Sequence, residues 1–128
     1  TVGDRLVYIG GVPTAEIFAE AYVSIGVNTY SSAVFNFVPE MAVTFYKELR
    51  KGNKDVVKQI TNDFFIPFVD LRDRKAGYAV SLIKAGAAIV GRPAGNVRAP
   101  LVMPTNEECL LLEALIKVAK KTNTSLML

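Results

Sequence analysis

Apolar residues in the first 52 positions follow two spacings, one typical of strands and one typical of helices. RLVYIGG is a short run of β-branched and aromatic residues closed by two glycines, which predicts a buried strand ending in a turn. In the following PTAEIFAEAYVSIG, apolar residues return at every third or fourth position. Thr14 stands where a helix cap is expected, and Gly26 where the helix would stop.

The strand and helix pattern then occurs a second time. VNTYSSAVFNF predicts a strand, and VPEMAVTFYKELRKG predicts a helix with Pro39 and Glu40 in its first turn and Gly52 after its end. Two successive strand-helix units imply parallel strands joined by right-handed crossovers. We expect residues 6–9 and 29–35 to be adjacent parallel strands whose C-terminal ends lie at the same rim.

After Gly52 the pattern predicts helices only. NKDVVKQITNDFFIPFVDLRD is amphipathic, with Asn53 as its cap and Pro67 as a kink or interruption. GYAVSLIKAG predicts a helix that ends at Gly86, and the Gly- and Pro-rich GRPAGNVRAPLVMP predicts a loop. TNEECLLLEALIKVAKK opens with the Ser/Thr-x-x-Glu spacing of a capping box, formed by Thr105 and Glu108. The final TNTSLML is expected to fray.

Two parallel strands leave unpaired backbone groups on both outer edges. Strands this apolar would aggregate unless neighbours covered them, so we expect the chain to be part of something larger. In the structure of this chain, the leftover apolar faces should be covered by another chain or left bare. The aromatic residues Phe64, Phe65 and Phe68 are interpreted as helical core or as a subunit interface.

Composition excludes several classes of protein. The chain has 128 residues, 51% of them hydrophobic and 21% charged, which predicts one folded domain rather than disorder. Its net charge of +3 is spread along the chain, and no basic tract indicates nucleic acid. Without histidine, His-based triads and His metal ligands are excluded. No apolar run reaches the roughly 18 residues of a membrane span. The single Cys109 and the lack of a signal-peptide pattern favour the cytoplasm.

Three separated motifs, GDRLVYIGGVPTAEIFAEAY, YSSAVFNFVPE and GRPAGNVRAPL, occur in an order and spacing that resemble a known family. The chain is similar to the C-terminal part of the dihydrodipicolinate synthase and N-acetylneuraminate lyase superfamily, and within it to the sugar-acid dehydratases. The resemblance implies an α/β fold, the C-terminal part of a TIM (β/α)8 barrel. Residues 1–52 would be its last two strand-helix units, and residues 53–128 a C-terminal helical bundle.

The resemblance also implies a chemistry. A lysine on the strand before this chain would form a Schiff base with a sugar-acid substrate, and loss of water and carbon dioxide would follow. No metal or organic cofactor is implied. The partners would be the small-molecule substrate, the remainder of the same barrel and further copies of the protein. The lysines of this chain fall on predicted helices, with Lys75 in a turn, so we expect no catalytic residue here and no activity from these residues alone.

In such barrels the active site lies at the C-terminal ends of the strands. The candidate substrate-binding residues are therefore Gly10, Gly11, Ser31, Ser32 and Asn36. Each has a structural alternative: the glycines as turn formers, the serines as small groups in a crowded barrel, and the asparagine as a partner of the backbone at the strand-helix turn.

Two arginines in the loop before the last predicted helix are further candidates for binding a carboxylate. Arg92 and Arg98 could grip such a group in a bidentate fork, but pairing with acidic groups between barrel and bundle is favoured. GRPAGN lacks the preceding strand and the Gly-Lys-Ser/Thr ending of a phosphate loop.

Two other functions stay open from the sequence. The first is an aldolase of the same superfamily that resembles dihydrodipicolinate synthase. The second is a non-catalytic α/β interaction module, which would be stable as a monomer of these residues alone.

Overall fold

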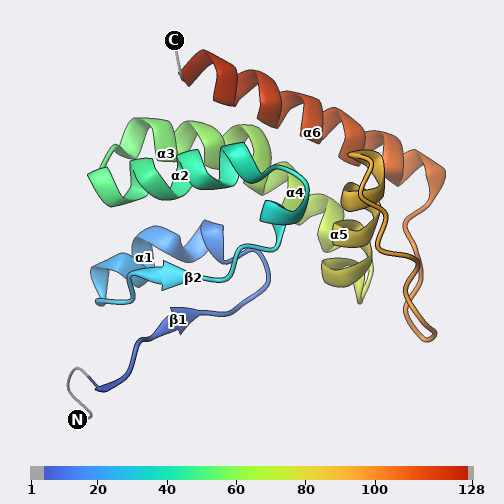
Figure 1. Cartoon of the computed structure of the whole chain (residues 1–128), viewed down its shortest axis with the longest axis horizontal. Helices are drawn as coiled ribbons and strands as arrows, with labels where there is room; N and C mark the ends of the chain where they lie inside the picture. Colours follow the sequence, from blue (N-terminus) through green and yellow to red (C-terminus); the bar gives the residue numbers. More distant parts are fainter. Residues whose placement is uncertain (1–4, 127–128) are drawn as a thin grey trace.

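The structure is a computed structural model and describes residues 5–126 (Figure 1). Its elements, in chain order, are β1 (Ile9–Gly10), a 3₁₀ turn (Ala15–Phe18), α1 (Ala19–Ser24), β2 (Thr29–Tyr30), a 3₁₀ turn (Val34–Asn36), α2 (Pro39–Lys51), α3 (Lys54–Ile60), a π-helical turn (Thr61–Phe65), α4 (Ile66–Arg72), α5 (Tyr78–Ile89) and α6 (Asn106–Leu126). Figure 1 shows the strands and α1 on one side of the α2 and α3 pair, and α6 on the other.

The two strands are parallel, as predicted. Ile9 lies opposite Thr29 and Gly10 opposite Tyr30. The backbone N–H of Ser31 extends this ladder by donating to the Gly10 carbonyl over 2.9 Å. Both C-terminal ends therefore lie at one rim, which confirms the predicted arrangement.

Both strands are shorter than the predicted ranges 6–9 and 29–35. Beyond Ser31 the chain turns, and the backbone and side-chain amides of Asn36 both donate to the Ala33 carbonyl, at 3.2 and 2.9 Å. A local side-chain bond of this kind competes with sheet pairing. Because each strand has one strand neighbour within residues 5–126, little sheet is available to hold the ends extended.

The apolar residues leading into β1, and Ile9 of β1 itself, are bare within the described chain. Leu6, Val7, Tyr8 and Ile9 are 55%, 86%, 57% and 61% exposed. The expectation of uncovered strand faces is therefore confirmed. Burying such residues removes apolar area from water, so this surface is suited to a covering neighbour.

Thr14 stands at the predicted cap position, directly before a 3₁₀ turn, but its side chain does not cap that turn. Its backbone is left-handed, with φ 53° and ψ 55°, and its side chain makes no capping bond. The buried hydroxyl instead accepts a hydrogen bond from Arg72 Nη1 at 3.0 Å. The chain enters a 3₁₀ turn before α1, while Gly26, at φ 87°, ends the helix as predicted.

The ends of α2 follow the sequence prediction closely. Pro39 is its first residue, and Gly52 stops it in the left-handed conformation at φ 74°. Asn53 then caps α3, its side-chain oxygen accepting from the Val56 N–H at 3.5 Å.

Pro67 does not interrupt the helical path, because a π-helical turn precedes it. Proline has no N–H and its ring would clash with the carbonyl four residues back, at Asp63. That carbonyl lies inside the turn Thr61–Phe65, where the wider winding relieves the clash. The chain therefore stays helical from Lys54 to Arg72.

The predicted end of α5 at Gly86 is wrong, since the helix continues to Ile89. A Cβ at Gly86 would lie 2.7 Å from Cδ1 of Phe37. The glycine therefore permits close packing of α5 against the turn before α2. Its presence reflects this packing and does not mark the end of the helix.

The capping box of α6 is confirmed. The Thr105 N–H donates to Glu108 Oε2 at 2.9 Å, and the Glu108 N–H donates to Thr105 Oγ1 at 3.2 Å. Fraying of residues 122–126 is not observed, because the helix runs to Leu126 and its buried Asn123 accepts from the Thr44 hydroxyl at 2.6 Å. Residues 127 and 128 lie outside the described range, as do residues 1–4 of the expected barrel unit.

One hydrophobic core joins the strand-helix units to the later helices. Phe45 of α2 meets Phe65 edge to face with ring centroids 4.9 Å apart, and Phe64 stacks on Phe68 at 5.8 Å. Phe64, Phe65 and Phe68 are at most 1% exposed, which confirms the core interpretation. Cys109 is half-buried against this core, as predicted for a small apolar group. Between residues 5 and 126, no helix is both long and apolar enough to cross a bilayer.

Candidate functional site

A cavity of about 250 Å³ lies at the C-terminal ends of the two strands, and we call it the strand-end cavity. Its lining comes from the loop after β1, the loop after β2 and the facing surfaces of α4 and α5. The lining residues are Gly11, Val12, Pro13, Thr14, Ser31, Ala33, Phe68, Arg72, Ala79, Val80 and Ile83. The cavity thus combines the predicted rim with helices that follow much later in the sequence.

The structure separates the two predicted glycines. Gly10 is buried, and a Cβ there would lie 2.6 Å from Cε2 of Tyr22 and 3.2 Å from Cβ of Tyr30. A Cβ at Gly11 would meet no atom within 4 Å. The missing side chain at Gly10 therefore lets α1 pack on the strand, whereas Gly11 keeps open space in the strand-end cavity.

The two predicted serines face different surroundings. Ser31 is exposed and lines the strand-end cavity. Ser32 lines another cavity, of about 410 Å³, beside Tyr30 and Tyr46 of α2, and its hydroxyl donates to Glu16 Oε1 at 2.6 Å. Only Ser31 joins Gly11 in the strand-end cavity.

Glu16 is a buried carboxyl group that sequence reasoning did not single out. It is 2% exposed, and among residues 5–126 its Oε2 has no hydrogen-bond partner. Burial raises the pKa of Glu16, and the hydrogen bond from Ser32 opposes that rise. The pKa of Tyr30 is also raised. Burial is the main cause, and the charge of Glu16 is the second. Glu16 lies in a 3₁₀ turn, whose three-residue period differs from the α-helical period that the sequence predicted for this segment.

Arg72, at the end of α4, is the second site residue that the sequence did not indicate. Its Nη1 donates to the Pro13 carbonyl at 2.9 Å and to Thr14 Oγ1 at 3.0 Å. Its Nε donates to Asp73 Oδ1 at 2.8 Å, and this bond lowers the pKa of Asp73. Arg72 therefore ties the helical part of the chain to the loop after β1.

Asn36 occupies the position that its structural alternative predicted. Its side chain donates to the Ala33 carbonyl at the strand-helix turn, and its own carbonyl accepts from Arg92 Nη2 at 3.1 Å. The favoured pairing of Arg92 and Arg98 with acidic side chains is not observed among the described residues. Arg92 binds a backbone carbonyl instead.

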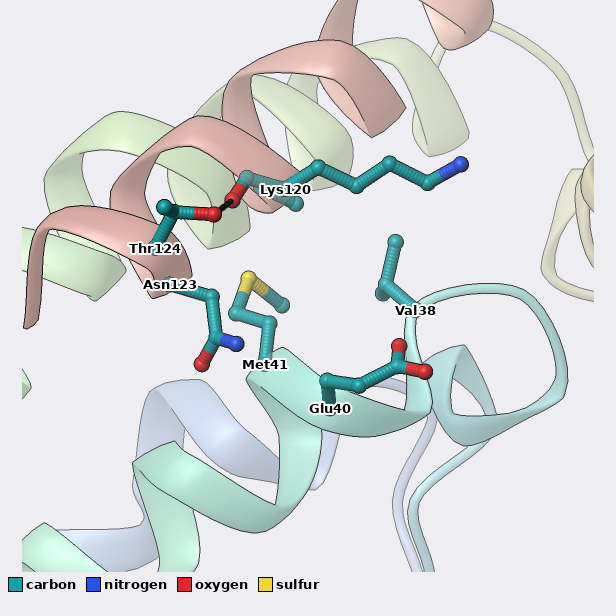
Figure 2. Close-up of a pocket in the computed structure, with 7 residues that line it drawn as sticks. Val38, Glu40, Met41, Lys120, Asn123 and Thr124 are labelled. Carbon is teal, nitrogen blue, oxygen red and sulfur yellow. Dashed lines mark hydrogen bonds between the residues drawn. The ribbon is translucent and has the colours of Figure 1, made fainter. Parts of the chain in front are cut away.

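A separate cavity of about 320 Å³ lies between the start of α2 and α6 (Figure 2). Figure 2 shows Glu40 and Met41 on the α2 side and Lys120 and Thr124 on the α6 side, with the Thr124 hydroxyl donating to the Lys120 carbonyl at 3.0 Å. None of the predicted site residues lines it. The strand ends therefore provide the better candidate site.

None of the lysines belongs to a strand, as predicted. All sit on helices except Lys75, which lies in the turn before α5; the helical ones are Lys47, Lys51, Lys54, Lys58, Lys84, Lys117, Lys120 and Lys121. Lys47 of α2 does line the cavity of about 410 Å³ beside Tyr30 and Ser32. In the part of the chain that the structure describes, no group of three or more Cys, Asp or Glu side chains is placed to hold a metal ion.

Comparisons with known proteins agree on one family. A sequence model of the Dihydrodipicolinate synthetase family matches residues 1–119. A probable 5-dehydro-4-deoxyglucarate dehydratase of Allorhizobium ampelinum is 56% identical over 121 residues, covering 94% of this chain and 40% of that protein. One of Cereibacter sphaeroides is 57% identical over 115 residues, covering 90% of this chain and 38% of that protein.

Solved structures give the same answer for the fold. Dihydrodipicolinate synthase from Bacillus clausii superposes with a TM-score of 0.78 at 30% identity, covering 94% of this chain and 40% of its own. Dihydrodipicolinate synthase from Oceanobacillus iheyensis superposes with a TM-score of 0.73 at 28% identity. The match covers 87% of this chain and 37% of that protein. The chain thus spans about 40% of the length of these relatives.

Proposed function

The chain belongs to the dihydrodipicolinate synthetase family, and we propose that it is the C-terminal segment of a 5-dehydro-4-deoxyglucarate dehydratase. The observation that carries the proposal is 56% identity, over 94% of this chain, to a protein of that name. The parallel strands support it, because their C-terminal ends meet at one cavity, where barrel enzymes of this kind bind their substrates.

We assign residues 1–52 to the last two strand-helix units of a (β/α)8 barrel and residues 53–128 to a C-terminal helical bundle. The parallel pairing of β1 and β2 and the bare apolar residues Leu6 and Val7 support the barrel assignment. The covering neighbour would be the remainder of the same barrel. The shared core means that the bundle packs directly on these two units. The expected cytoplasmic location and homo-oligomer remain part of the proposal and rest on the sequence and its resemblance.

The proposed reaction converts 5-dehydro-4-deoxy-D-glucarate to 2,5-dioxopentanoate, carbon dioxide and water. A lysine outside this chain would attack the keto carbon and form an iminium, releasing water. The iminium is a better electron sink than the ketone, so it acidifies the adjacent methylene and permits β-elimination of a hydroxyl group. Loss of the carboxylate as carbon dioxide and hydrolysis of the iminium would return the free lysine. The cavity walls would exclude bulk water from these charged intermediates.

Within this chain, we propose that Gly11 and Ser31 contact the substrate. Both line the strand-end cavity, Gly11 by leaving space and Ser31 by presenting a hydroxyl group. Gly10, Ser32 and Asn36 would support the site from behind. Gly10 leaves room for the ring of Tyr22, and the Ser32 hydroxyl donates to Glu16. The Asn36 side chain stabilises the turn after β2.

A second candidate is an aldolase that resembles dihydrodipicolinate synthase. It is favoured by the two solved structures of that name, at 30% and 28% identity. The identity to the dehydratases is higher, at 56% and 57%, so the dehydratase remains the main proposal.

The test uses the full-length protein that contains this segment. Incubation with 5-dehydro-4-deoxyglucarate should yield 2,5-dioxopentanoate and carbon dioxide, and borohydride should trap one substrate-derived adduct per subunit on a lysine outside this segment. A stoichiometric adduct on any lysine of this segment would overturn the assignment of the nucleophile. Turnover of pyruvate with an aldehyde, and none of the sugar acid, would favour the aldolase.

Ser31→Ala and Ser32→Ala in the same protein separate substrate contact from support. Loss of a hydrogen bond to a charged substrate should lower kcat/KM of Ser31→Ala by roughly 10-fold or more with little change in melting temperature. Ser32→Ala should lower the melting temperature, because it leaves the buried Glu16 without its partner. Wild-type kinetics in both variants would refute the site assignment.

A further inference from the structure

We propose that Arg72 binds a carboxylate group of the substrate in the strand-end cavity, and that it makes the site selective for dicarboxylic over monocarboxylic 2-oxo acids. The inference rests on the proposed function, in which the substrate is an aldarate derivative with a carboxylate at each end. It adds a residue of the helical part to the substrate contacts proposed for Gly11 and Ser31.

The first observation is the charge of the cavity lining. Arg72 is the one charged residue that lines the strand-end cavity within residues 5–126. The other lining residues are apolar, except for Thr14 and Ser31 with their neutral hydroxyl groups. In a concave site with few other polar groups, a single guanidinium favours entry and binding of an anion.

The second observation is how the guanidinium group is held. Two bonds from Nη1, to the Pro13 carbonyl and Thr14 Oγ1, fix its orientation on the loop after β1. Nε contacts Asp73, which is 62% exposed and is therefore a weakly held partner. Among the described residues Nη2 has no hydrogen-bond partner, although the side chain is only 15% exposed. A fixed guanidinium with free N–H groups is the arrangement that binds carboxylates well.

The third observation is backbone strain at the residue that Arg72 holds. Thr14 is the one non-glycine residue with positive φ between residues 5 and 126, and its side chain is 3% exposed. A β-branched residue adopts this conformation only when its surroundings impose it, and such residues cluster at ligand sites. The side chain of this residue is held by the bond from Arg72 to its hydroxyl.

A purely structural role would make Arg72 a clamp between α4 and the loop after β1. The clamp and the binding role differ in one measurable way. Loss of a clamp weakens every ligand alike, whereas loss of a carboxylate partner weakens only ligands that carry the second carboxylate.

The experiment measures binding of two probes of equal length to the full-length protein by isothermal titration calorimetry. 2-Oxoadipate has a carboxylate at each end, and 2-oxohexanoate has a methyl group at the far end. The variants are Arg72→Lys and Arg72→Met. The matched control is Arg50→Met, because Arg50 also holds a loop, through Asn28 Oδ1 at 2.9 Å, but lies outside the cavity.

The wild-type protein and Arg50→Met should bind 2-oxoadipate more tightly than 2-oxohexanoate by roughly 10- to 100-fold, the usual contribution of a hydrogen bond to a charged group. Arg72→Met should lose that preference, and Arg72→Lys should keep part of it because the charge remains. In kinetics with the sugar acid, KM should rise more than kcat falls.

Three results would overturn the inference. The wild-type protein could bind both probes equally well, Arg72→Met could keep the wild-type preference for 2-oxoadipate, or Arg72→Met could bind both probes more weakly by the same factor. Arg72→Lys decides the question if the methionine variant does not fold. Failure of the proposed function would be seen separately, as a wild-type protein that does not turn over 5-dehydro-4-deoxyglucarate. The binding preference would still decide the role of Arg72.

Discussion

The helical core and the strand rim of this chain differ sharply in how complete they are. Phe64, Phe65 and Phe68 are at most 1% exposed, whereas Val7 and Ile9 are 86% and 61% exposed. A helix satisfies its backbone within its own segment and needs neighbours only for side-chain packing. A strand needs neighbours for its backbone as well. The helices therefore satisfy most of their backbone within their own segments, whereas the strands are suited to further neighbours.

The hydrogen bonding of two carboxyl groups, a partly buried one and a buried one, shows the same difference. Near the start of α6, Glu108 Oε2 accepts from the Tyr78 hydroxyl at 2.6 Å and from the Thr105 N–H, and the Tyr78 bond is the main cause that lowers the pKa of Glu108. At the rim, Glu16 has one oxygen bonded to Ser32 and one without a partner in the described chain. A half-satisfied buried carboxyl group is destabilising, which is typical of sites retained for function.

The largest effect should come from removing a core ring. Phe65→Ala should lower the free energy of unfolding by about 3–5 kcal/mol, since Phe65 is fully buried between Phe45 and Phe64. Val7→Ala in the same 128-residue chain should change it by less than about 0.5 kcal/mol. Denaturant titrations of both variants provide the measurement. In the full-length protein, Val7→Ala should become clearly destabilising; a neutral result there would show that no neighbour covers Val7.

A smaller effect is expected at the two glycines of the rim, and it differs between them. Gly10→Ala should destabilise the protein by about 1–3 kcal/mol, because the added Cβ would overlap the ring of Tyr22. Gly11→Ala meets no atom, so its melting temperature should match the wild type while its KM for substrate rises in the full-length protein. Equal changes in melting temperature in the two variants would contradict the assignment of Gly10 to packing and of Gly11 to the cavity.

The subtlest effect should appear as a pH dependence. The pKa of Glu16 is raised above its ordinary value of 4.5 in the folded chain, so folding favours the protonated form. Its contribution to stability is fully present below pH 4.5 and is lost as pH rises through the folded-state pKa. Glu16→Gln, which keeps an acceptor for Ser32, should remove this part of the slope. Parallel stability curves of wild type and variant across that range would contradict the pKa direction.

Local signals in the sequence predicted the helix ends well. The left-handed stop at Gly52, the cap at Asn53 and the capping box at Thr105 each depend on residues within four positions of one another. Pro67 and Gly86 gave local signals that the fold overrode. A π-helical turn accommodates the proline, and the glycine makes room for Phe37.

The candidate site was predictable only in part. The rim position of Gly11 and Ser31 follows from two strand-helix units, because parallel strands end on the same side. Arg72 could not be found this way, since it meets Thr14 from 58 positions away. Glu16 was hidden by the change from helical to 3₁₀ winding, which turned a polar position inward.

The sequence by itself determined the order of the elements, the parallel direction of the strands and the family resemblance, because these depend on short-range periodicity and on motifs. The tertiary structure decided which rim residues face the cavity, that Glu16 is buried beside Ser32, and that Arg72 reaches the loop after β1. These outcomes depend on contacts between distant segments, and such contacts form only when packing fixes the distances between side chains.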